Sequence, residues 1–234
     1  MPIREEDHPA RGNESQPFKR RFNGWKFTAA LLLCFLLSAV GILLALSWMP
    51  QDLSDVQGYG TQGAVTDLPS VFQNAVQNGE EAVFTEAEIN RYLQDTLKFG
   101  QRGVFNVIAR PCGVAVRIHD GYAELILDRL LGARLHQTIS VYLTFRSIRE
   151  DDGIKINLEY RGGSDILGSM PRGGTIGLIS VPERYILILH PSVEGIRKTY
   201  EGFFSQIADS GYLPRFIKDE NGGDNRLILQ PPSS

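Results

Sequence analysis

The clearest pattern along the chain is an uncharged apolar run, Phe27–Met49. About 20 apolar residues in a helix, rising ~1.5 Å each, cover the ~30 Å hydrocarbon core of a bilayer. The run therefore predicts one transmembrane helix, with Trp25 and Trp48 at the two headgroup levels. Basic residues precede it closely, and the next Lys or Arg after it is Arg91. This asymmetry predicts a cytoplasmic N-terminus and an extracytoplasmic remainder. The basic residues are Lys19, Arg20, Arg21 and Lys26.

Two other interpretations of this segment stay open. Ala45-Leu46-Ser47 has the small-x-small pattern of a signal-peptidase site. Secretory apolar cores run about 7–15 residues, and this core is longer, which favours an uncleaved anchor. A lipoprotein anchor at Cys34 fits less well, because Leu33 stands where a small residue is needed.

Polar segments flank the apolar run. Residues 1–26 are charged and rich in breakers, which predicts a disordered cytoplasmic tail. Residues 50–82 predict a linker, because 50–69 are rich in Gly, Gln, Asp and Ser; a short helix fits Ser70–Gln77. The folded domain is expected over residues 83–234.

The domain opens with a strong helix signal. Thr85 and Glu88 form a capping box, in which two otherwise unbonded amides are satisfied reciprocally. Apolar residues then recur at helical spacing until Gly100. The pattern predicts a helix from about Glu86 to Phe99.

Strand periodicity follows the helix. Apolar and polar residues alternate over 114–128, around Asp120-Gly121, and over 139–160, around residues 151–153. An Asp-Gly pair between alternating runs is a strong hairpin signal. Alternation over two hairpins predicts an antiparallel sheet with one buried face and one polar face.

The last third of the chain is mixed. Its composition predicts a flexible loop over 161–175, a short strand over 176–181, helices over 183–189 and 192–209, and a final strand over 226–230. The fold class expected from the whole pattern is α+β: an N-terminal transmembrane helix, then an extracytoplasmic antiparallel sheet with helices packed on one face.

The charge and the cysteine content of the chain exclude some classes of partner and of metal site. Residues 1–50 hold six basic and four acidic residues; from the totals of 24 and 27, the remainder holds 18 basic and 23 acidic. A mildly acidic outer domain argues against nucleic acid as a partner and against docking on anionic lipid headgroups. Cys34 lies in the apolar run and Cys112 outside it, so they cannot pair, and a cysteine zinc site is excluded.

The sequence motifs that could indicate nucleotide binding, metal binding or hydrolysis are either absent or lack the secondary structure that they require. Residues 58–63 match G-x-G-x-x-G, but a polar linker precedes them where a nucleotide site needs a strand. No histidine has a metal-site frame, and no G-x-S-x-G elbow is present. We therefore expect no enzyme activity and no cofactor or metal. A hydrolase would need Cys112 or a histidine beside a carboxylate in a cleft.

The polar face of the predicted sheet carries charged and aromatic residues that alternate outward on neighbouring strands. It is either a solvated face with cross-strand charge pairs or a binding face for a protein or glycan. Its residues are Arg117, His119, Glu124, Tyr142, Arg146, Lys155 and Glu159.

Short motifs resemble those of the YpmS-type family of bacterial membrane-anchored proteins. They are the T-E-x-E-x-N helix with Thr85, Glu86, Glu88 and Asn90, then Gly177–Pro182, Leu213–Ile217 and Arg226–Leu229. The likeness covers roughly residues 83–230. It implies an extracytoplasmic α+β domain related to lipid-handling folds, without catalytic residues to carry over.

Two main functions follow. The first is a non-catalytic, membrane-tethered envelope protein that binds or scaffolds other components, in the cell (inner) membrane with its domain extracytoplasmic or periplasmic. The second is binding or transfer of a lipid or other apolar ligand. An open apolar groove between sheet and helices would favour the second. An envelope hydrolase comes third, and a homodimer is neither predicted nor excluded.

Overall fold

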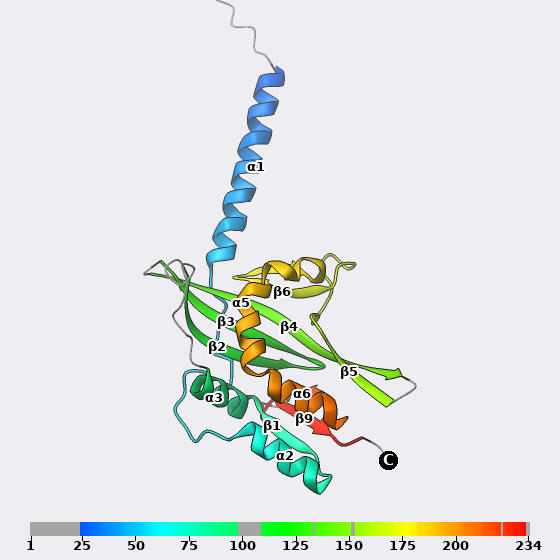
Figure 1. Cartoon of the computed structure of the whole chain (residues 1–234). Coiled ribbons are helices and arrows are strands. Elements are labelled where there is room, and N and C mark those ends of the chain that lie inside the picture. The colour runs from blue at the N-terminus through cyan, green and yellow to red at the C-terminus, as the bar shows by residue number, and fades with distance from the viewer. Residues whose placement is uncertain (1–23, 98–108, 133, 151–152, 221, 233–234) are drawn as a thin grey trace, which may run out of the picture. The chain divides into compact units, whose positions relative to one another are not determined.

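The computed structural model describes residues 24–97, 109–132, 134–150, 153–220 and 222–232. For 109, 147–150, 153–158, 188, 190–193 and 197 it describes the backbone alone. The chain divides into two compact units, residues 1–40 and 41–234. Figure 1 shows the order of their elements. Residues 1–23 of the predicted tail lie outside the described part.

Helix α1, Gly24–Trp48, begins three residues before the predicted Phe27 and ends one residue before the predicted Met49. Its side chains are not buried in the structure, and the helix is long and apolar enough to cross a membrane. A signal sequence near an N-terminus has the same properties, so the structure confirms the helix but not a span across a membrane.

An antiparallel sheet, six-stranded in the described residues, is the centre of the 41–234 unit. Its order is β2-β3-β4-β6-β7, with β5 paired to β4. The β2–β3 hairpin turns at Asp120-Gly121, as predicted, and the β4–β5 hairpin is also confirmed. The strands are β2 Ala109–His119, β3 Tyr122–Leu131, β4 Leu135–Glu150, β5 Gly153–Glu159, β6 Arg172–Ile176 and β7 Ile179–Pro182.

The expectation of a loop over 161–175 is wrong at its end, where β6 pairs with β4. Gly173 and Gly174 are buried in this strand. A Cβ on Gly174 would collide with the backbone of Ser140, so the two strands approach where a side chain would not fit. A strand built on glycine has no hydrophobic alternation, and its composition therefore resembles that of a loop.

A second antiparallel sheet, three-stranded in the described residues, has the order β1-β9-β8. Its strands are β1 Ala82–Thr85, β8 Leu213–Ile217 and β9 Arg226–Gln230, the last with the predicted bounds. Helix α3, Glu86–Thr96, follows β1 directly and has the predicted capping box.

The C-terminal helices are η1 Glu183–Ile188, α5 His190–Thr199 and α6 Glu201–Ser210. The helix predicted over 192–209 is interrupted at Tyr200, which has φ −108° and ψ 11°. Tyr200 is buried, and its hydroxyl lies 2.7 Å from the hydroxyl of Thr96. The apolar stripe runs on across the break, so periodicity does not reveal it.

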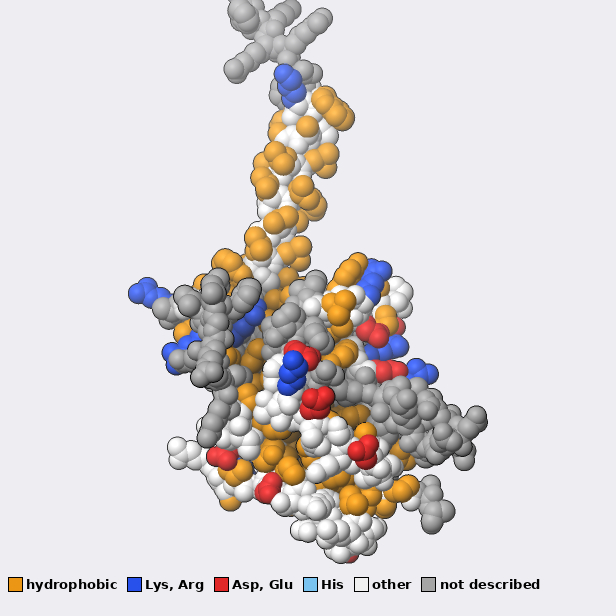
Figure 2. Space-filling view, viewed as in Figure 1, with side chains coloured by type: hydrophobic (Ala, Val, Ile, Leu, Met, Phe, Trp, Pro, Cys, Tyr) orange, Lys and Arg blue, Asp and Glu red, His pale blue; other side chains and the backbone are white. Residues whose placement is uncertain are grey.

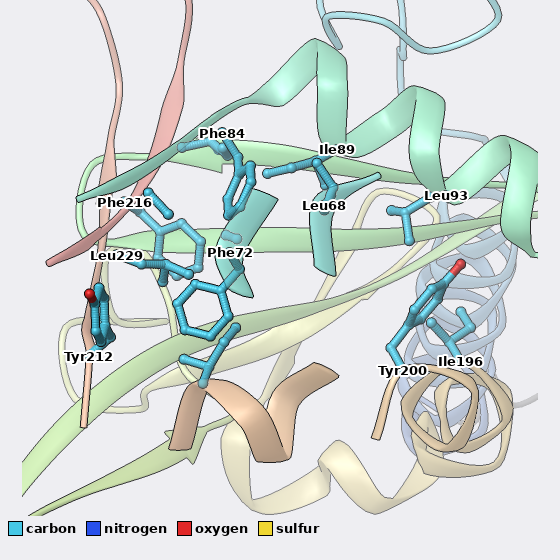
Figure 3. Packing of buried hydrophobic residues seen from close by; sticks show 14 of the residues in the cluster. Leu68, Phe72, Phe84, Ile89, Leu93, Ile196, Tyr200, Tyr212, Phe216 and Leu229 are labelled. Carbon is cyan, nitrogen blue, oxygen red and sulfur yellow. The ribbon is translucent and has the colours of Figure 1, made fainter. Parts of the chain in front are cut away.

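The main core lies between the inner face of the central sheet, the small sheet and the helices (Figure 3). Phe72 of α2, Leu68–Asn78, stands edge-on to Tyr212 and Phe203, at centroid distances of 5.4 and 6.0 Å. Val114, Ile118, Ala123 and Leu127 face this core from β2 and β3.

Residues 50–82, expected as a linker with a short helix over Ser70–Gln77, belong to the 41–234 unit, and the short helix is α2. Val56 packs with Ala115 and Ile126 on the face of the sheet opposite the main core, and Leu68 and Phe72 enter the main core. Val56 stands between Asp55 and Gln57, so its burial depends on partners that are remote in sequence. We call residues 50–59 the strap.

Candidate functional site

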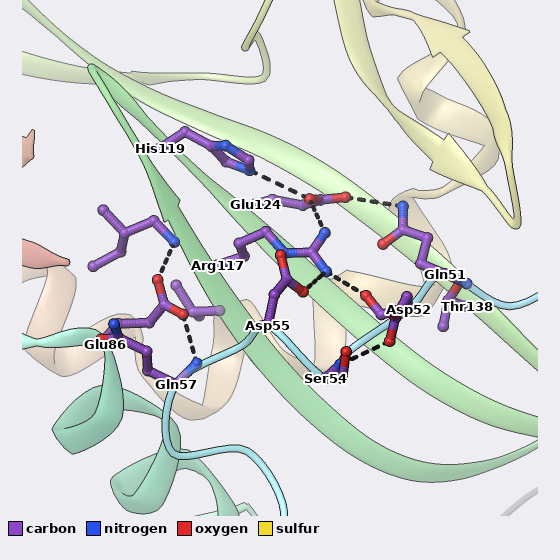
Figure 4. A network of polar contacts seen from close by, with 12 residues as sticks. Gln51, Asp52, Ser54, Asp55, Gln57, Glu86, Arg117, His119, Glu124 and Thr138 are labelled. Carbon is purple, nitrogen blue, oxygen red and sulfur yellow. Dashed lines mark hydrogen bonds and ion pairs between the residues drawn. The ribbon is translucent and has the colours of Figure 1, made fainter. Parts of the chain in front are cut away.

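The strap is bonded along the polar face of the central sheet (Figure 4). Gln51 donates from its backbone to Thr138 (2.9 Å) and from its side chain to Glu124 (3.0 Å) and Thr175 (2.7 Å). Arg117 makes ion pairs with Asp55 (2.7 Å) and Glu124 (3.1 Å). The polar network therefore joins the strap to β2, β3, β4 and β6.

The strap covers much of the face that the sequence suggested as a binding surface. Register places Arg117, Glu124 and Tyr142 in one row across β2, β3 and β4. Glu124 and Tyr142 keep only 3 % and 8 % of their exposure. Burial, followed by the charge of Glu124, raises the pKa of Tyr142 to about 12. These side chains therefore stabilise the fold, and a large partner cannot reach them.

The other suggested residues lie around this row. The ring of His119 stacks on Tyr122 at 4.5 Å, and its Nε2 lies 3.5 Å from Glu124. Arg146 is 68 % exposed and pairs with Glu159 at 3.2 Å, so this edge stays open to solvent. Lys155 is in β5, but its side chain lies outside the described residues.

Acid is expected to weaken the attachment of the strap. Burial acts to raise the pKa of Glu124, but the nearby polar groups of His119, Ser140 and Gln51 and the charge of Arg117 outweigh it, so this pKa lies below its ordinary 4.5. A carboxyl group of this kind contributes stability above its unfolded pKa and loses it as the pH falls through the folded value. We expect the free energy of unfolding to fall below pH 4.5, and to fall less in Glu124→Gln.

Urea unfolding at several pH values below 4.5 measures this effect. Glu159→Gln is the matched control, because its partner Arg146 is exposed and such surface pairs contribute little. Equal pH dependence in the wild type and Glu124→Gln would contradict the expected role of Glu124.

The acidic helix motif that carries the family resemblance forms a buried clamp. Glu86 is fully buried and accepts from the backbone of Gln57 (2.8 Å) and Ile118 (2.7 Å) and from the Asn225 amide (2.8 Å). Asn90, one turn later, donates to the carbonyls of Gln57 and Val116, both at 2.8 Å. The motif thus holds the strap and β2 against α3.

Residues that could support hydrolysis lie apart from the cavities described below. His136 approaches Asp128 at 3.4 Å on the exposed side of the sheet. The thiol of Cys112 is exposed and lies 3.6 Å from the Arg110 carbonyl oxygen. Among the described residues, His, Cys, Asp and Glu form no group of three or more that could hold a metal ion.

An apolar cavity of about 140 Å³ lies between the inner face of the central sheet and the helices. Leu125, Leu143 and Phe145 line it from the sheet, and Phe203 and Ile207 from α6. Glu194, on α5, is its charged lining residue. Phe204 also lines it and is exposed, so the cavity opens beside α6; Figure 2 shows hydrophobic side chains at the surface between α3 and α6.

This cavity was not predicted residue by residue. Apolar periodicity places the same side chains on inner faces whether or not the elements fill the space between them. Residues 185–207 are rich in large apolar side chains, and several of them line the cavity.

The geometry of the strap and the cavity is the basis for assigning a function. The resemblance to the YpmS-type family stays a prediction. Comparison of the chain with protein-family models, with curated proteins and with solved structures gives no match.

Proposed function

We propose that this chain is a membrane-anchored protein whose extracytoplasmic domain binds an apolar ligand, such as the end of a lipid acyl chain, in the cavity beside α5 and α6. The cavity is the observation that carries the proposal. Protein interiors contain few voids larger than a water molecule. An apolar cavity of about 150 Å³ stays dry and binds a benzene-sized molecule, and this one is about 140 Å³.

Anchoring is the second part of the proposal. The length and apolar surface of α1 suit a bilayer span, and the basic residues before it favour a cytoplasmic N-terminus. The domain would then stand on the opposite side of the cell membrane, next to a store of acyl chains. The proposal assigns the domain no reaction and no cofactor.

The two faces of the central sheet favour apolar-ligand binding over scaffolding, because one face is covered and the other borders an open apolar space. The polar face is covered by the strap, and Arg117 and Glu124 are engaged with it. The inner face keeps an apolar space with an opening. The edge at Arg146 and Glu159 remains as a smaller surface for a protein partner.

Filling the cavity is expected to remove ligand binding while keeping the fold. Ala123 is buried and lines the cavity. Leucine at this position would occupy empty space, so the free energy of unfolding should stay within about 1 kcal/mol of wild type. The test is labelling of the full chain in nanodiscs by a palmitate carrying a diazirine near its methyl end, followed by peptide mapping. Labels are expected on β3, β4 and α6 in the wild type, and at background level in Ala123→Leu.

Ala208→Leu is the matched control, because Ala208 is on the exposed side of α6. It should label like the wild type, and excess palmitate should compete in both. Labelling of Ala123→Leu at the wild-type level, or wild-type labels that avoid the cavity lining, would overturn the proposal.

A further inference from the structure

The C-terminal end of α1 is held by the folded unit. The last carbonyls of a helix lack partners within it. Here the backbone of Leu178 donates to Leu46 (3.0 Å), and the Gln137 amide donates to Ser47 (2.6 Å). The strap continues this attachment at Gln51. Residues 46–51 are therefore fixed against the β6–β7 turn and β4.

Large apolar side chains are exposed around this attachment. Leu178 is in the β6–β7 turn, which bonds to residue 46, and η1 packs on β6 and β7. In η1, Ile186 packs into a buried cluster while Tyr185 and Leu187 are exposed, Leu187 at 75 %. Figure 1 shows η1 beside β6, at the end of the folded unit that residues 46–49 enter.

Leu167 adds an unusual feature beside η1. It is 88 % exposed and has φ 51°, in the left-handed region that leucine rarely adopts. Its turn is closed by Ile166 and Met170, and Met170 lies 3.3 Å from the guanidinium of Arg184 in η1. Packing inside the folded unit explains neither the left-handed backbone conformation of Leu167 nor the exposure of its side chain. Contiguous exposed apolar patches often mark sites of interaction.

Basic residues border these apolar side chains. The guanidinium of Arg184 lies 4.8 Å from the ring centre of Tyr185. With Arg146 and Arg161 it lines an open groove of about 700 Å³, which Glu159 and Glu183 also line. Arginine binds phosphate through paired hydrogen bonds, and aromatic and basic residues favour the headgroup level.

We propose that these side chains form a membrane-facing patch that enters the headgroup region of the bilayer holding α1. The patch consists of Trp48, Met49, Leu167, Leu178, Tyr185 and Leu187. The inference rests on the proposed span of α1: if Trp48 lies at the interface, Leu178, bonded to residue 46, lies at a similar depth. The occupant is therefore lipid rather than a second copy of the chain.

Quenching by brominated lipid tests the patch in the full chain. Leu187→Trp is made in a background in which Trp25 and Trp48 are phenylalanine, and reconstituted into vesicles of phosphatidylcholine brominated near the headgroup end of the acyl chains. Side chains in this zone lie about 5–10 Å into the boundary, within reach of the bromines. We expect the tryptophan introduced by Leu187→Trp to be quenched as strongly as Trp48 in a variant that retains Trp48 alone.

Val76→Trp in the same background is the matched control, because Val76 is exposed on α2, away from this attachment in Figure 1. It should be quenched little. If Trp48 is quenched and the Leu187→Trp variant is not, the proposed membrane contact of the patch is wrong, while the proposed span of α1 still stands. Unquenched Trp48 would overturn the span of α1, and with it this inference. Blue-shifted but unquenched emission from the Leu187→Trp variant would overturn the patch by identifying a protein contact in place of lipid.

Discussion

Replacing Glu86 with alanine is expected to lower the free energy of unfolding by about 3–5 kcal/mol, because two buried donors and one half-buried donor lose their acceptor. Each unsatisfied buried group costs about 1–3 kcal/mol. The donors are the backbone amides of Gln57 and Ile118 and the side chain of Asn225. Glu86 is fully buried, so its carboxylate is shielded from bulk water in the wild type. Urea unfolding of the full chain in a mild detergent, followed by circular dichroism, gives the measurement.

Glu88→Ala is the control for Glu86, because both lie in the first turn of α3. It removes a capping box, which is expected to cost about 1 kcal/mol. Should Glu86→Ala fail to fold, Glu86→Gln keeps the shape and is expected to lose about 1–3 kcal/mol, since one oxygen still accepts. Hydrogen exchange should then accelerate first at the amides of Gln57 and Ile118. A cost for Glu86→Ala no larger than that for Glu88→Ala would contradict the clamp.

Replacing Gly177 with alanine is expected to release the end of α1 from the domain. Gly177 has φ 56°, and a Cβ there would lie 2.6 Å from the carbonyl oxygens of Leu46 and Ser47 and 2.7 Å from that of Met49. The left-handed conformation costs a side chain about 1–2 kcal/mol. Separation also breaks the bond from Leu178 to Leu46 and the bond from Gln137 to Ser47, at about 1 kcal/mol each. The expected loss is about 3 kcal/mol.

Gly168→Ala is the control that separates the cost of the left-handed backbone conformation from the cost of the clash with α1. Gly168 has φ 72° and nothing within 4 Å of its added Cβ, so this variant experiences the conformational cost alone. Urea unfolding compares the two variants. Proteolysis at residues 50–59 gives a local reading, because the strap should become accessible only in Gly177→Ala. Equal stability and equal cleavage of both variants would show that the close approach at Gly177 has no energetic role.

Local signals in the sequence determined much of the fold. The apolar run, the capping box at Thr85 and the Asp120-Gly121 turn each depend on residues close together in sequence, so α1, α3 and the β2–β3 hairpin could be predicted from them. The final strand, Arg226–Gln230, has the predicted bounds for the same reason.

The polar residues of the sheet show where sequence reasoning reached its limit. Alternation correctly placed Arg117, Glu124 and Tyr142 on one face. It could not show that this face is covered, because the strap has no periodicity and its partners are remote. Gln51, for example, bonds Thr175, 124 residues later.

What the sequence alone determined is the α+β class, the apolar helix and the faces of the strands, because helix and strand periods are local properties of the chain. Only the tertiary structure decided that the strap closes the polar face, that Glu86 and Asn90 clamp it, and that a cavity remains beside α6. Burial of a polar group requires partners from distant segments, and a cavity depends on how closely packed elements approach. Neither property belongs to any single stretch of sequence.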